Sequence, residues 1–277
     1  MQQKSILITG CSSGIGYASA QELKKRGWRV FASCRKMEDC YQLKGQGFDS
    51  PLIDYSNPSS IASGMEEVLT ATDGKLDALF NNGAYAIPGA VEDISTEALR
   101  AIFEVNFFGW HDLTHRAIPV MRAQGRGRIV QCSSVLGLAT MPWRGAYNAT
   151  KFALEGITDT LRIEMRDTPI HIVLIEPGPI TSNFRLNSIL QFENWIDWKA
   201  SPRSAQYRDE LRQRLYKNTQ KTDLFELPAK AVVKKLIHAL ESPRPQPRYY
   251  VTTPTYLLGI LRRILPTRAL DAIMARG

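Results

Sequence analysis

Residues 9–16 of this chain read Thr9-Gly10-Cys11-Ser12-Ser13-Gly14-Ile15-Gly16, and they follow directly on the apolar run Ile6-Leu7-Ile8. An apolar strand that leads into a glycine-rich turn and then a helix is typical of the first βα unit of a dinucleotide-binding fold. The spacing is TGxxxGxG, one residue longer between the first two glycines than in GxGxxG. Glycines here allow a tight turn and a close approach of backbone to a pyrophosphate. We therefore expect a phosphate-binding turn formed by Gly10, Ser12, Ser13, Gly14, Ile15 and Gly16.

Apolar runs alternate with amphipathic stretches along most of the remaining chain. This alternation predicts an α/β protein with a doubly wound parallel sheet and helices on both faces. The length of 277 residues fits a single Rossmann domain that occupies residues 1–277. The helix after the third strand should begin at Pro58, with Asn57 as its N-cap. We expect seven strands, at residues 6–8, 30–33, 52–54, 78–81, 128–131, 171–175 and 249–251.

Two segments depart from the alternation. Residues 183–227 carry aromatic side chains among many charges, and long segments of this kind are usually lids or binding loops. The alternative for this insert is a peripheral helical pair whose aromatic residues face the core. Residues 254–277 form an expected C-terminal helical extension, which is apolar with two adjacent arginines. We favour its packing on the domain or on another subunit, and the alternative is contact with an anionic membrane surface.

The composition excludes several classes of protein. Hydrophobic residues make up 44% and charged residues 22%, as in an ordinary globular protein. The net charge is +8, but the basic residues are scattered without a stripe interleaved with aromatics, so we expect no nucleic-acid partner. No apolar run is long enough to span a bilayer, and the first strand begins too near Met1 for a signal peptide. The four cysteines form no CxxC pair, so we expect free thiols, a cytoplasmic location and no metal site.

The end of the second strand indicates which nicotinamide dinucleotide binds. NAD-binding folds place a carboxylate there, about twenty residues after the glycine turn, whereas an arginine accommodates the 2′-phosphate of NADP. In this chain the segment reads Ser33-Cys34-Arg35-Lys36, with no acid before Glu38. Arg35 offers a two-pronged contact to phosphate, to which the hydroxyls of the glycine turn add donors. The sequence therefore predicts NADP(H), with NAD(H) as the alternative.

Four polar residues downstream have a distinctive order and spacing. Ser134 lies thirteen positions before Tyr147, Lys151 follows Tyr147 by four positions, and Asn106 stands upstream. Together with the glycine turn, this pattern resembles the classical short-chain dehydrogenase/reductase family over nearly the whole chain. Within that family the chain resembles the branch of retinol dehydrogenases and 17β-hydroxysteroid dehydrogenases, on residues 9–16, 34–36, 151–156 and 175–179.

The resemblance implies carbonyl reduction, or its reverse, with Tyr147 exchanging a proton with the substrate oxygen. A free tyrosine, with a pKa of about 10, is a weak acid at neutral pH. Lys151 lies one helical turn later on the same face, so we expect its ammonium to lower the pKa of Tyr147. In the family, Tyr147 and Lys151 also contact the nicotinamide ribose side of the cofactor. Ser134 bonds the carbonyl oxygen, and Asn106 holds a water that connects Lys151 to solvent.

Further cofactor contacts follow from the same resemblance. Asp54 matches the family position that bonds the adenine amino group, and an ordinary turn-forming aspartate is the alternative. Asn82 lies in the turn behind the adenine ribose, which reads Asn81-Asn82-Gly83-Ala84 where the family has NNAG. Ala84 thus replaces a glycine that can adopt a positive φ, which puts the geometry of this turn in question. The element PGxxxT, whose threonine bonds the nicotinamide carboxamide, is matched by Pro177, Gly178 and Thr181.

These expectations describe an NADPH-dependent reductase of aldehydes or ketones that also acts as an alcohol dehydrogenase. The alternatives are a steroid- or retinoid-specific dehydrogenase and a non-catalytic NADP(H)-sensing protein. The family resemblance implies a homodimer or homotetramer. Residues 138–143 carry no charge, so we expect an apolar small-molecule substrate, unless a basic residue of the insert folds inward to bind a carboxylate. The predicted pocket residues are Met141, Trp143 and Phe184.

Overall fold

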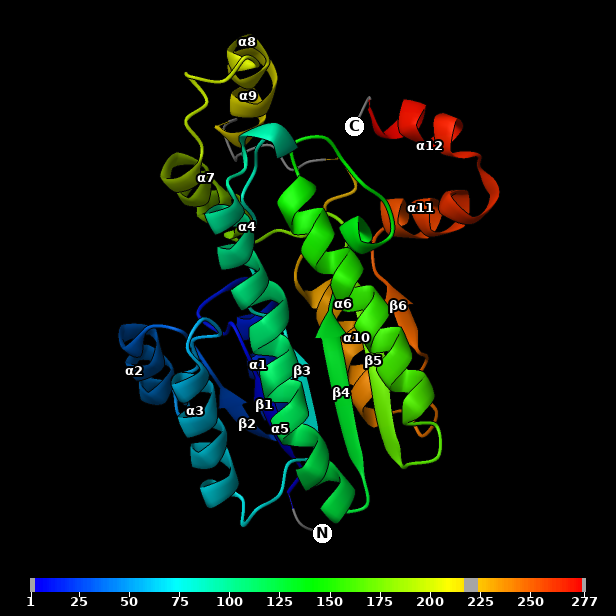
Figure 1. The fold of residues 1–277 in the computed structure, drawn as a ribbon. Coiled ribbons are helices and arrows are strands. Elements are labelled where there is room, and N and C mark those ends of the chain that lie inside the picture. Colours follow the sequence, from blue (N-terminus) through cyan, green and yellow to red (C-terminus); the bar gives the residue numbers. More distant parts are fainter. Residues whose placement is uncertain (1–2, 217–223, 276–277) are drawn as a thin grey trace.

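The computed structural model describes residues 3–216 and 224–275, and a parallel β-sheet lies at its centre (Figure 1). The strands are β1 (Ser5–Ile8), β2 (Arg29–Ala32), β3 (Ala78–Asn81), β4 (Gly127–Cys132), β5 (Ile170–Glu176) and β6 (Arg248–Tyr250). Their order is β2-β1-β3-β4-β5-β6, and every neighbouring pair is parallel. The chain turns to one side of β1 for β2 and to the other side for β3, so the predicted doubly wound topology is confirmed.

Helices cover both faces of this sheet. The longer ones are α1 (Gly14–Lys25), α2 (Met37–Gly45), α3 (Pro58–Ala71), α4 (Thr96–Phe103), α5 (Gly109–Ala123), α6 (Gly145–Glu164), α7 (Phe184–Trp195), α10 (Lys230–Glu241), α11 (Thr253–Ile264) and α12 (Thr267–Met274). Shorter ones are α8 (Ser204–Gln206), α9 (Arg212–Leu215), the 3-10 turns η1 (Val91–Asp93) and η3 (Val135–Gly137), and the π-helical turns η2 (Glu104–Phe108) and η4 (Tyr207–Leu211). Figure 1 shows α3, α5 and α6 in front of the sheet and α1 and α10 behind it.

The predicted strand at residues 52–54 is wrong, because the sheet has six strands among the described residues. The segment runs beside β2 but pairs with it only through isolated bridges, Phe31–Asp49 and Cys34–Leu52. Between these bridges lies Pro51, which has no backbone N–H to donate to a ladder. The carbonyl oxygen of Ala32 accepts instead from the hydroxyl of Ser50, at 2.6 Å. A side chain thus replaces the missing backbone donor, and no continuous strand forms.

The other local signals agree with the structure. Asn57 caps α3, since its side-chain oxygen accepts from the backbone N–H groups of Ser59 and Ser60 at 3.0 and 3.2 Å. Strand β1 is wholly buried, and Ile6, Leu7 and Ile8 lie at the centre of the main hydrophobic core. A strand apolar on both faces is what a parallel sheet covered by two helix layers requires.

The insert and the C-terminal extension lie at one end of the molecule, beyond the carboxyl ends of the strands (Figure 1). The insert contains α7, α8, η4 and α9, and its residues 217–223 lie outside the described residues. The extension contains α11 and α12, which form an arm that stands away from the sheet (Figure 1). Within the described ranges, every helix is too short or too polar to cross a membrane.

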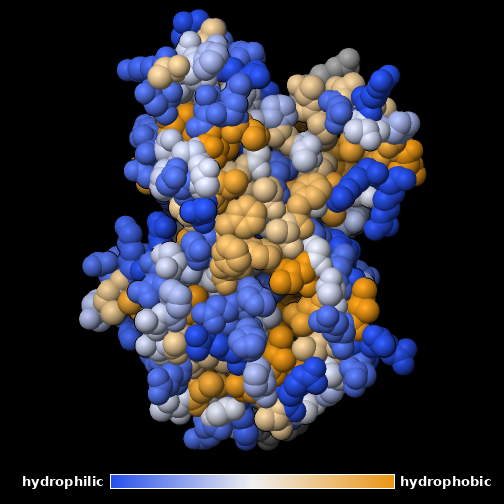
Figure 2. Space-filling model, in the orientation of Figure 1, coloured by the Kyte–Doolittle hydropathy of each residue, from blue (hydrophilic) through white to orange (hydrophobic). Residues whose placement is uncertain are grey.

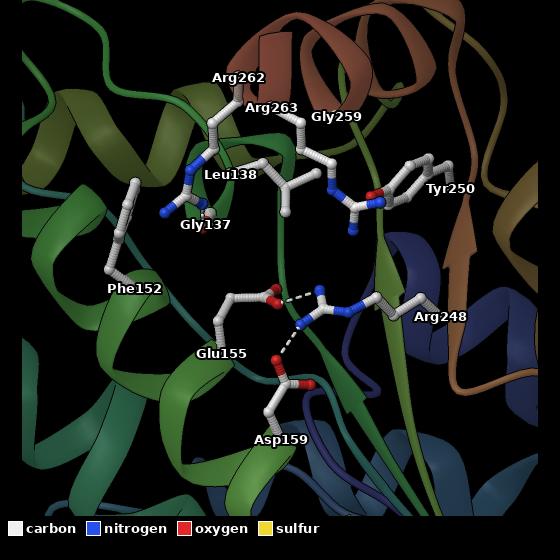
Figure 3. Close-up of a pocket in the computed structure, with 10 residues that line it drawn as sticks. All are labelled: Gly137, Leu138, Phe152, Glu155, Asp159, Arg248, Tyr250, Gly259, Arg262 and Arg263. Atoms are coloured by element: carbon white, nitrogen blue, oxygen red, sulfur yellow. Dashed lines mark hydrogen bonds and ion pairs between the residues drawn. The ribbon is translucent and has the colours of Figure 1, made fainter. Parts of the chain in front are cut away.

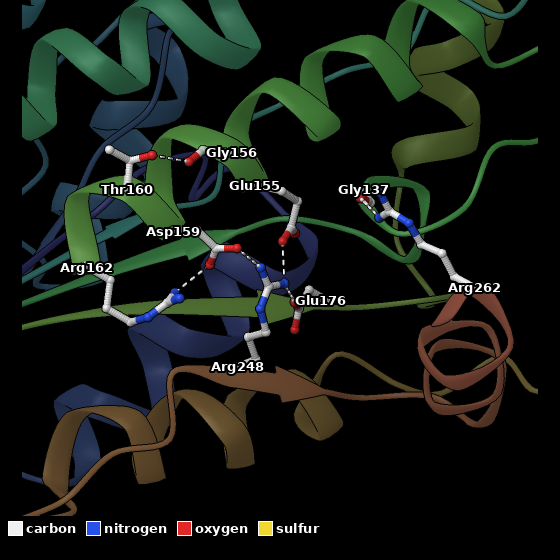
Figure 4. Close-up of polar contacts among 9 residues, drawn as sticks. All are labelled: Gly137, Glu155, Gly156, Asp159, Thr160, Arg162, Glu176, Arg248 and Arg262. Atoms are coloured by element: carbon white, nitrogen blue, oxygen red, sulfur yellow. Dashed lines mark hydrogen bonds and ion pairs between the residues drawn. The ribbon is translucent and has the colours of Figure 1, made fainter. Parts of the chain in front are cut away.

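A cluster of charges joins β6 to α6 and β5. One guanidinium nitrogen of Arg248 donates to Glu155 and Glu176, and the other donates to Asp159, each at 2.5 Å (Figure 4). Glu176 is fully buried, and one of its carboxyl oxygens has no hydrogen-bond partner. Burial, followed by the neighbouring charge of Glu155, raises the pKa of Glu176 to about 8, against the opposing effect of Arg248.

We predict that Glu176→Gln raises the free energy of unfolding increasingly as the pH rises from 4.5 to about 8. In that interval folded Glu176 keeps a proton that the unfolded chain has lost, so wild-type stability falls with rising pH. Glutamine resembles the protonated form and removes this loss, which for the full shift amounts to about 5 kcal/mol at most. Urea unfolding at several pH values measures the difference. Exposed Glu164→Gln is the control, and a uniform loss of stability in Glu176→Gln at every pH would contradict the assignment.

Candidate functional site

The glycine turn lies at the carboxyl end of β1, beside the point where the strand order reverses. Gly10 and Gly14 have positive φ angles of +68° and +59°. A Cβ at Gly10 would lie 2.6 Å from the Cα of Gly83, and a Cβ at Gly16 would lie 2.3 Å from the carbonyl oxygen of Gly10. Lack of space therefore excludes a side chain at both Gly10 and Gly16, and the left-handed backbone disfavours one at Gly10 and Gly14.

The start of α1 presents donors that fit an anion. The first N–H groups of a helix have no partner within it, and the side chain of Ser13 makes no capping bond. Ser12 is exposed next to it. A pyrophosphate fits such a helix start and the bare backbone of the turn, so the residues present suit a dinucleotide.

The turn after β3 is closed by hydrogen bonds. The side chain of Asn82 donates to the carbonyl oxygen of Thr9 at 3.0 Å, and its backbone N–H donates to the Thr9 hydroxyl at 2.9 Å. Neither Gly83 nor Ala84 has a positive φ. The exchange of glycine and alanine relative to NNAG therefore requires no left-handed backbone, and Gly83 instead allows close contact with Gly10.

Two further predicted cofactor residues lie near the end of β2. Arg35 is exposed, and it is near enough to Tyr85 for its charge to act on the pKa of that phenol. Asp54 is half-buried, and one of its carboxylate oxygens accepts from the backbone N–H and the hydroxyl of Ser56 at 2.9 and 2.7 Å. Asp54 therefore forms the turn that the alternative interpretation describes.

The loop after β5 lies against the base of the C-terminal arm. Pro177 is buried, and a Cβ at Gly178 would lie 2.1 Å from the hydroxyl of Thr252. Thr181 is exposed, and its backbone N–H donates to the carbonyl oxygen of Leu227 at 3.0 Å. Thr181 thus lies on an open surface of this loop.

Lys151 is buried in α6 among polar and aromatic groups. Its ammonium donates to the carbonyl oxygen of Cys132 at 2.8 Å, at the end of β4. It also lies 4.2 Å from the ring centroid of Trp110 and 5.6 Å from that of Tyr147. Burial lowers the pKa of Lys151 to about 8, although Cys132 and Glu155 act in the opposite direction. The predicted proximity of Tyr147 and Lys151 on one helix face is thus present.

The pKa of Tyr147 is raised, although the proximity of Lys151 was expected to lower it. Burial raises the pKa of the Tyr147 phenol, the nearby thiol of Cys132 raises it further, and hydrogen bonding with Ser134 lowers it. A phenolate removed from water loses more solvation than its neighbours replace, so the prediction of a lowered pKa is wrong for the protein alone.

Ser134 and Asn106 occupy the positions that the sequence suggested. Ser134 follows β4 directly, and its hydroxyl oxygen accepts from the backbone N–H of Leu136 at 3.1 Å. Asn106 lies in the π-helical turn η2, where its side chain bonds both backbone groups of Tyr85 at 3.1 and 2.8 Å. Its amide nitrogen also lies 3.3 Å from the hydroxyl of Thr150. Turns of this type occur often at functional sites.

Sequence reasoning missed Trp110 as a member of this site. Its ring covers the ammonium of Lys151, and its indole N–H donates to the carbonyl oxygen of Gly83 at 2.9 Å. Trp110 thus connects the turn after β3 to the buried cation. The signal for it was its spacing, since Trp110 follows Asn106 by four residues, one helical turn along the same face.

The three predicted pocket residues lie in two places. The ring of Phe184 contacts that of Tyr147 edge to face, with centroids 5.4 Å apart. Met141 and Trp143 instead line a mostly apolar cavity of about 380 Å³, which is bounded by Val91, Thr140, Pro142 and the outer face of α6 and does not include Phe184. Trp143 and Phe184 both pack against the hydrophobic cluster that contains Tyr147, and a single substrate pocket formed by Met141, Trp143 and Phe184 stays a prediction.

Aromatic contacts connect the insert to the loop that carries Trp143. Trp143 has a φ of +64°, which is strained for a bulky residue, and its ring lies 4.8 Å from that of Tyr207. Tyr207 is fully buried; its hydroxyl donates to Asp93 at 2.7 Å and accepts from the N–H of Ala90 at 2.8 Å. The insert therefore packs on the loop before α6 through a side chain with satisfied hydrogen bonds.

Arg144, three residues before Tyr147, brings a positive charge close to this region. It is half-buried, and the positive charges of Arg185 and Arg214 act on it from the insert. Burial first, and then these like charges, lower the pKa of Arg144 to about 10. Its guanidinium donates a hydrogen bond to the carbonyl oxygen of Trp143 at 3.3 Å. The substrate side of the site is thus less apolar than residues 138–143 suggested.

The arrangement as a whole combines a bare backbone turn that fits an anion with a buried hydroxyl, phenol and ammonium. Ser134, Tyr147 and Lys151 come together at the carboxyl ends of the central strands, where open α/β sheets bind ligands. No group of three or more His, Cys, Asp or Glu that could hold a metal occurs among residues 3–216 and 224–275. The side chains can therefore bind a carbonyl oxygen and exchange a proton with it.

Known oxidoreductases resemble this chain along nearly its whole length. The family model described as short chain dehydrogenase matches residues 4–190. The uncharacterized oxidoreductase YbbO of Escherichia coli is 41% identical over 99% of this chain and 95% of its own length. The NADPH-dependent 3-dehydrocapnine reductase of Ornithobacterium rhinotracheale is 31% identical, over 96% of this chain and 94% of its own.

Two further comparisons concern the branch of the family and the fold. The 17-beta-hydroxysteroid dehydrogenase type 6 of Rattus norvegicus is 30% identical over 99% of this chain and 89% of its own length, in agreement with the predicted branch. A short chain dehydrogenase/reductase from Burkholderia phymatum, solved in complex with NAD, superimposes with a TM-score of 0.77 at 25% identity. That match covers 98% of this chain and 95% of the solved one.

Proposed function

This chain belongs to the short-chain dehydrogenase family, and from that premise we propose that it is an NADPH-dependent reductase of aldehydes or ketones, reversibly an alcohol dehydrogenase. The observation that carries the proposal is the meeting of Tyr147, Lys151 and Ser134 beside the glycine turn. A non-catalytic NADP(H)-sensing protein would not need this set of polar side chains. A steroid- or retinoid-specific dehydrogenase remains the narrower alternative.

In the proposed mechanism the protein supplies orientation and a proton. The glycine turn, Asn82 and the loop with Thr181 would hold the dinucleotide, which supplies the hydride when bound. The Ser134 hydroxyl donates a hydrogen bond to the carbonyl oxygen, and Tyr147 donates its proton to that oxygen as negative charge develops on it. A raised pKa keeps Tyr147 protonated until that moment. Lys151, held by Cys132, then stabilises the phenolate, and Asn106 maintains the proton path to solvent.

Two residue patterns support NADP(H) as the cofactor. Arg35 is exposed at the end of β2, and the chain has no carboxylate there before Glu38. One relative is NADPH-dependent by name, although one solved relative holds NAD. Arg35 is therefore proposed to bind the 2′-phosphate, and Asp54 to bond the adenine amino group through its remaining oxygen.

The substrate side suggests two classes of carbonyl compound. The ring of Phe184 over Tyr147 and the apolar loop before α6 favour aliphatic or aromatic aldehydes and ketones. Arg144, for which the described residues provide no carboxylate partner, favours a second candidate, a carbonyl compound that bears a carboxylate. We propose the apolar class as the principal one, with residues 183–227 as its lid.

The proposal includes the assembly and location of the protein. Family resemblance supports a homodimer or homotetramer, and a reducing cytoplasm suits the four cysteines, which are all buried and unpaired.

We predict that Tyr147→Phe lowers turnover at least about a hundredfold, because the ring stays and only the proton donor is lost. NADPH binding should stay within about threefold of wild type, since cofactor contacts lie mainly elsewhere. A screen of NADPH oxidation against aldehydes, ketones, retinoids and ketosteroids identifies the substrate for the measurement. Exposed Tyr41→Phe is the matched control. Turnover of a tenth or more of wild type in Tyr147→Phe would remove the assigned role.

We predict that Arg35→Ala weakens NADPH binding by about ten- to a hundredfold and leaves NADH binding nearly unchanged, because only NADPH carries the 2′-phosphate. Fluorescence titration with both cofactors measures the two dissociation constants. The control is Lys25→Ala, which removes an exposed cation at the far end of α1. An equal loss for both cofactors would instead assign Arg35 to structure.

We predict that kcat/KM rises by up to about fourfold per methylene along a series of straight-chain aldehydes, since each buried methylene contributes about 0.8 kcal/mol. A matched series of aldehydes that end in a carboxylate tests the second candidate. If the acids are preferred, Arg144→Gln should abolish that preference and spare the neutral aldehydes. A flat response to chain length with neither preference would refute both substrate classes and leave the reductase assignment intact.

A further inference from the structure

The helix α11 packs on the domain through its small and basic residues. Thr255 and Gly259 are buried, and a Cβ at Gly259 would lie 2.7 Å from the ring of Tyr250. Arg262 lies over the ring of Phe152 at 4.8 Å. Figure 3 shows the side chains of Arg262 and Arg263 pointing from α11 toward α6, into a cavity of about 310 Å³. The face of α11 next to the domain is therefore small and cationic.

The opposite face of α11 is apolar and exposed. Leu257, Ile260 and Ile264 have exposed fractions of 54%, 58% and 68%, and Tyr256 is also exposed. The positions 256, 260 and 264 repeat every four residues, and 257 lies beside them, so the four form one stripe. A helix on a globular protein normally turns its apolar stripe inward. Here the orientation is reversed, which costs free energy unless something apolar covers the stripe.

The charge of the C-terminal arm indicates which kind of surface covers the apolar stripe of α11. Residues 242–275 contain five arginines and one acidic residue, Asp271. Carboxylates of the domain neutralise Arg248, but no residue of the described ranges forms an ion pair with Arg262, Arg263 or Arg268. These three cations lie on α11 and α12, the arm beyond the sheet in Figure 1, and Figure 2 shows apolar surface on the same arm.

We propose that α11 binds the surface of an anionic phospholipid bilayer, with its apolar stripe among the acyl chains, and that the net positive charge of the arm attracts the anionic headgroups. A helix that lies in the interface in this way buries one apolar face and keeps its cations at headgroup depth. At twelve residues α11 is about 18 Å long, too short to span the bilayer. This inference goes beyond the proposed function and does not depend on it.

A second copy of the chain is the less suitable occupant of the stripe. A two-fold contact brings identical surfaces together, so the unpaired arginines of one arm would approach those of the other. The net positive charge of each arm, three arginines against Asp271, opposes such a contact, whereas anionic lipid attracts it. The arm thus combines exposed isoleucine and leucine with three arginines and a single acid, Asp271.

Vesicle co-sedimentation of the full chain tests the proposal. The protein should sediment with phosphatidylcholine vesicles that contain phosphatidylglycerol, and much less with phosphatidylcholine alone. Ile260→Glu should weaken binding by about tenfold or more, because it places a charge in the stripe that the acyl chains would bury. Ile163→Glu is the matched control, since Ile163 on α6 has the same exposed fraction of 58%, and it should bind like wild type. Arg263→Gln with Arg268→Gln should weaken binding by about fivefold per charge and reduce its salt dependence.

The remaining outcomes separate the alternatives. Ile264→Gln is a second, uncharged test of the stripe, and thermal unfolding verifies that each variant is folded. No binding by the wild type, or equal binding by Ile260→Glu and the wild type, would overturn the proposal. It would also be overturned if Ile260→Glu changed the oligomeric mass in sedimentation equilibrium while vesicle binding was absent, because the stripe would then bind a second copy. Reductase activity toward a water-soluble aldehyde should be unaffected by these variants, so failure of either proposal is recognised separately.

Discussion

The buried ammonium of Lys151 is the constraint on which the arrangement of the site depends. A charge this deep is costly unless polar and aromatic groups surround it. The carbonyl oxygen of Cys132 and the ring of Trp110 provide that environment, at 2.8 and 4.2 Å. Because Trp110 also bonds the carbonyl oxygen of Gly83, one cation holds together the ends of β3 and β4 and the helices α5 and α6. The contacts of Lys151 therefore also fix the position of Tyr147, which lies one turn earlier on α6.

Tyr147 takes its chemical character from the same burial. Removal from water raises its pKa, and the lowered pKa of Lys151 has the same cause. The same environment of low polarity thus favours the uncharged form of both side chains. Ser134 is the polar neighbour of Tyr147. A tyrosine that stays protonated and a lysine with a pKa of about 8 suit a site of this kind. Negative charge appears in it only when an oxyanion or an anionic ligand is present.

The substrate side is built on packing between distant segments. Tyr207 from the insert contacts Trp143 from the loop before α6, and its hydroxyl is held by Asp93. The strained backbone of Trp143 is tolerated because these contacts determine its position. The C-terminal arm shows the opposite relation, since α11 directs its cations inward and its apolar residues outward. The proposed substrate selection and the proposed surface attachment thus involve different segments at the same end of the molecule.

Local backbone and spacing constraints in the sequence alone determined the glycine turn, the doubly wound topology, the start of α3 at Pro58 and the shared helix face of Tyr147 and Lys151. Glycine conformation, proline at a helix start and helical periodicity act within a few residues, so they are legible without the fold. Only the tertiary structure decided the pKa of Tyr147, the place of Trp110 and the loss of a seventh strand at Pro51. Each of these depends on burial or on a hydrogen-bond partner far away in the chain, and free energies of that kind exist only once the segments are packed together.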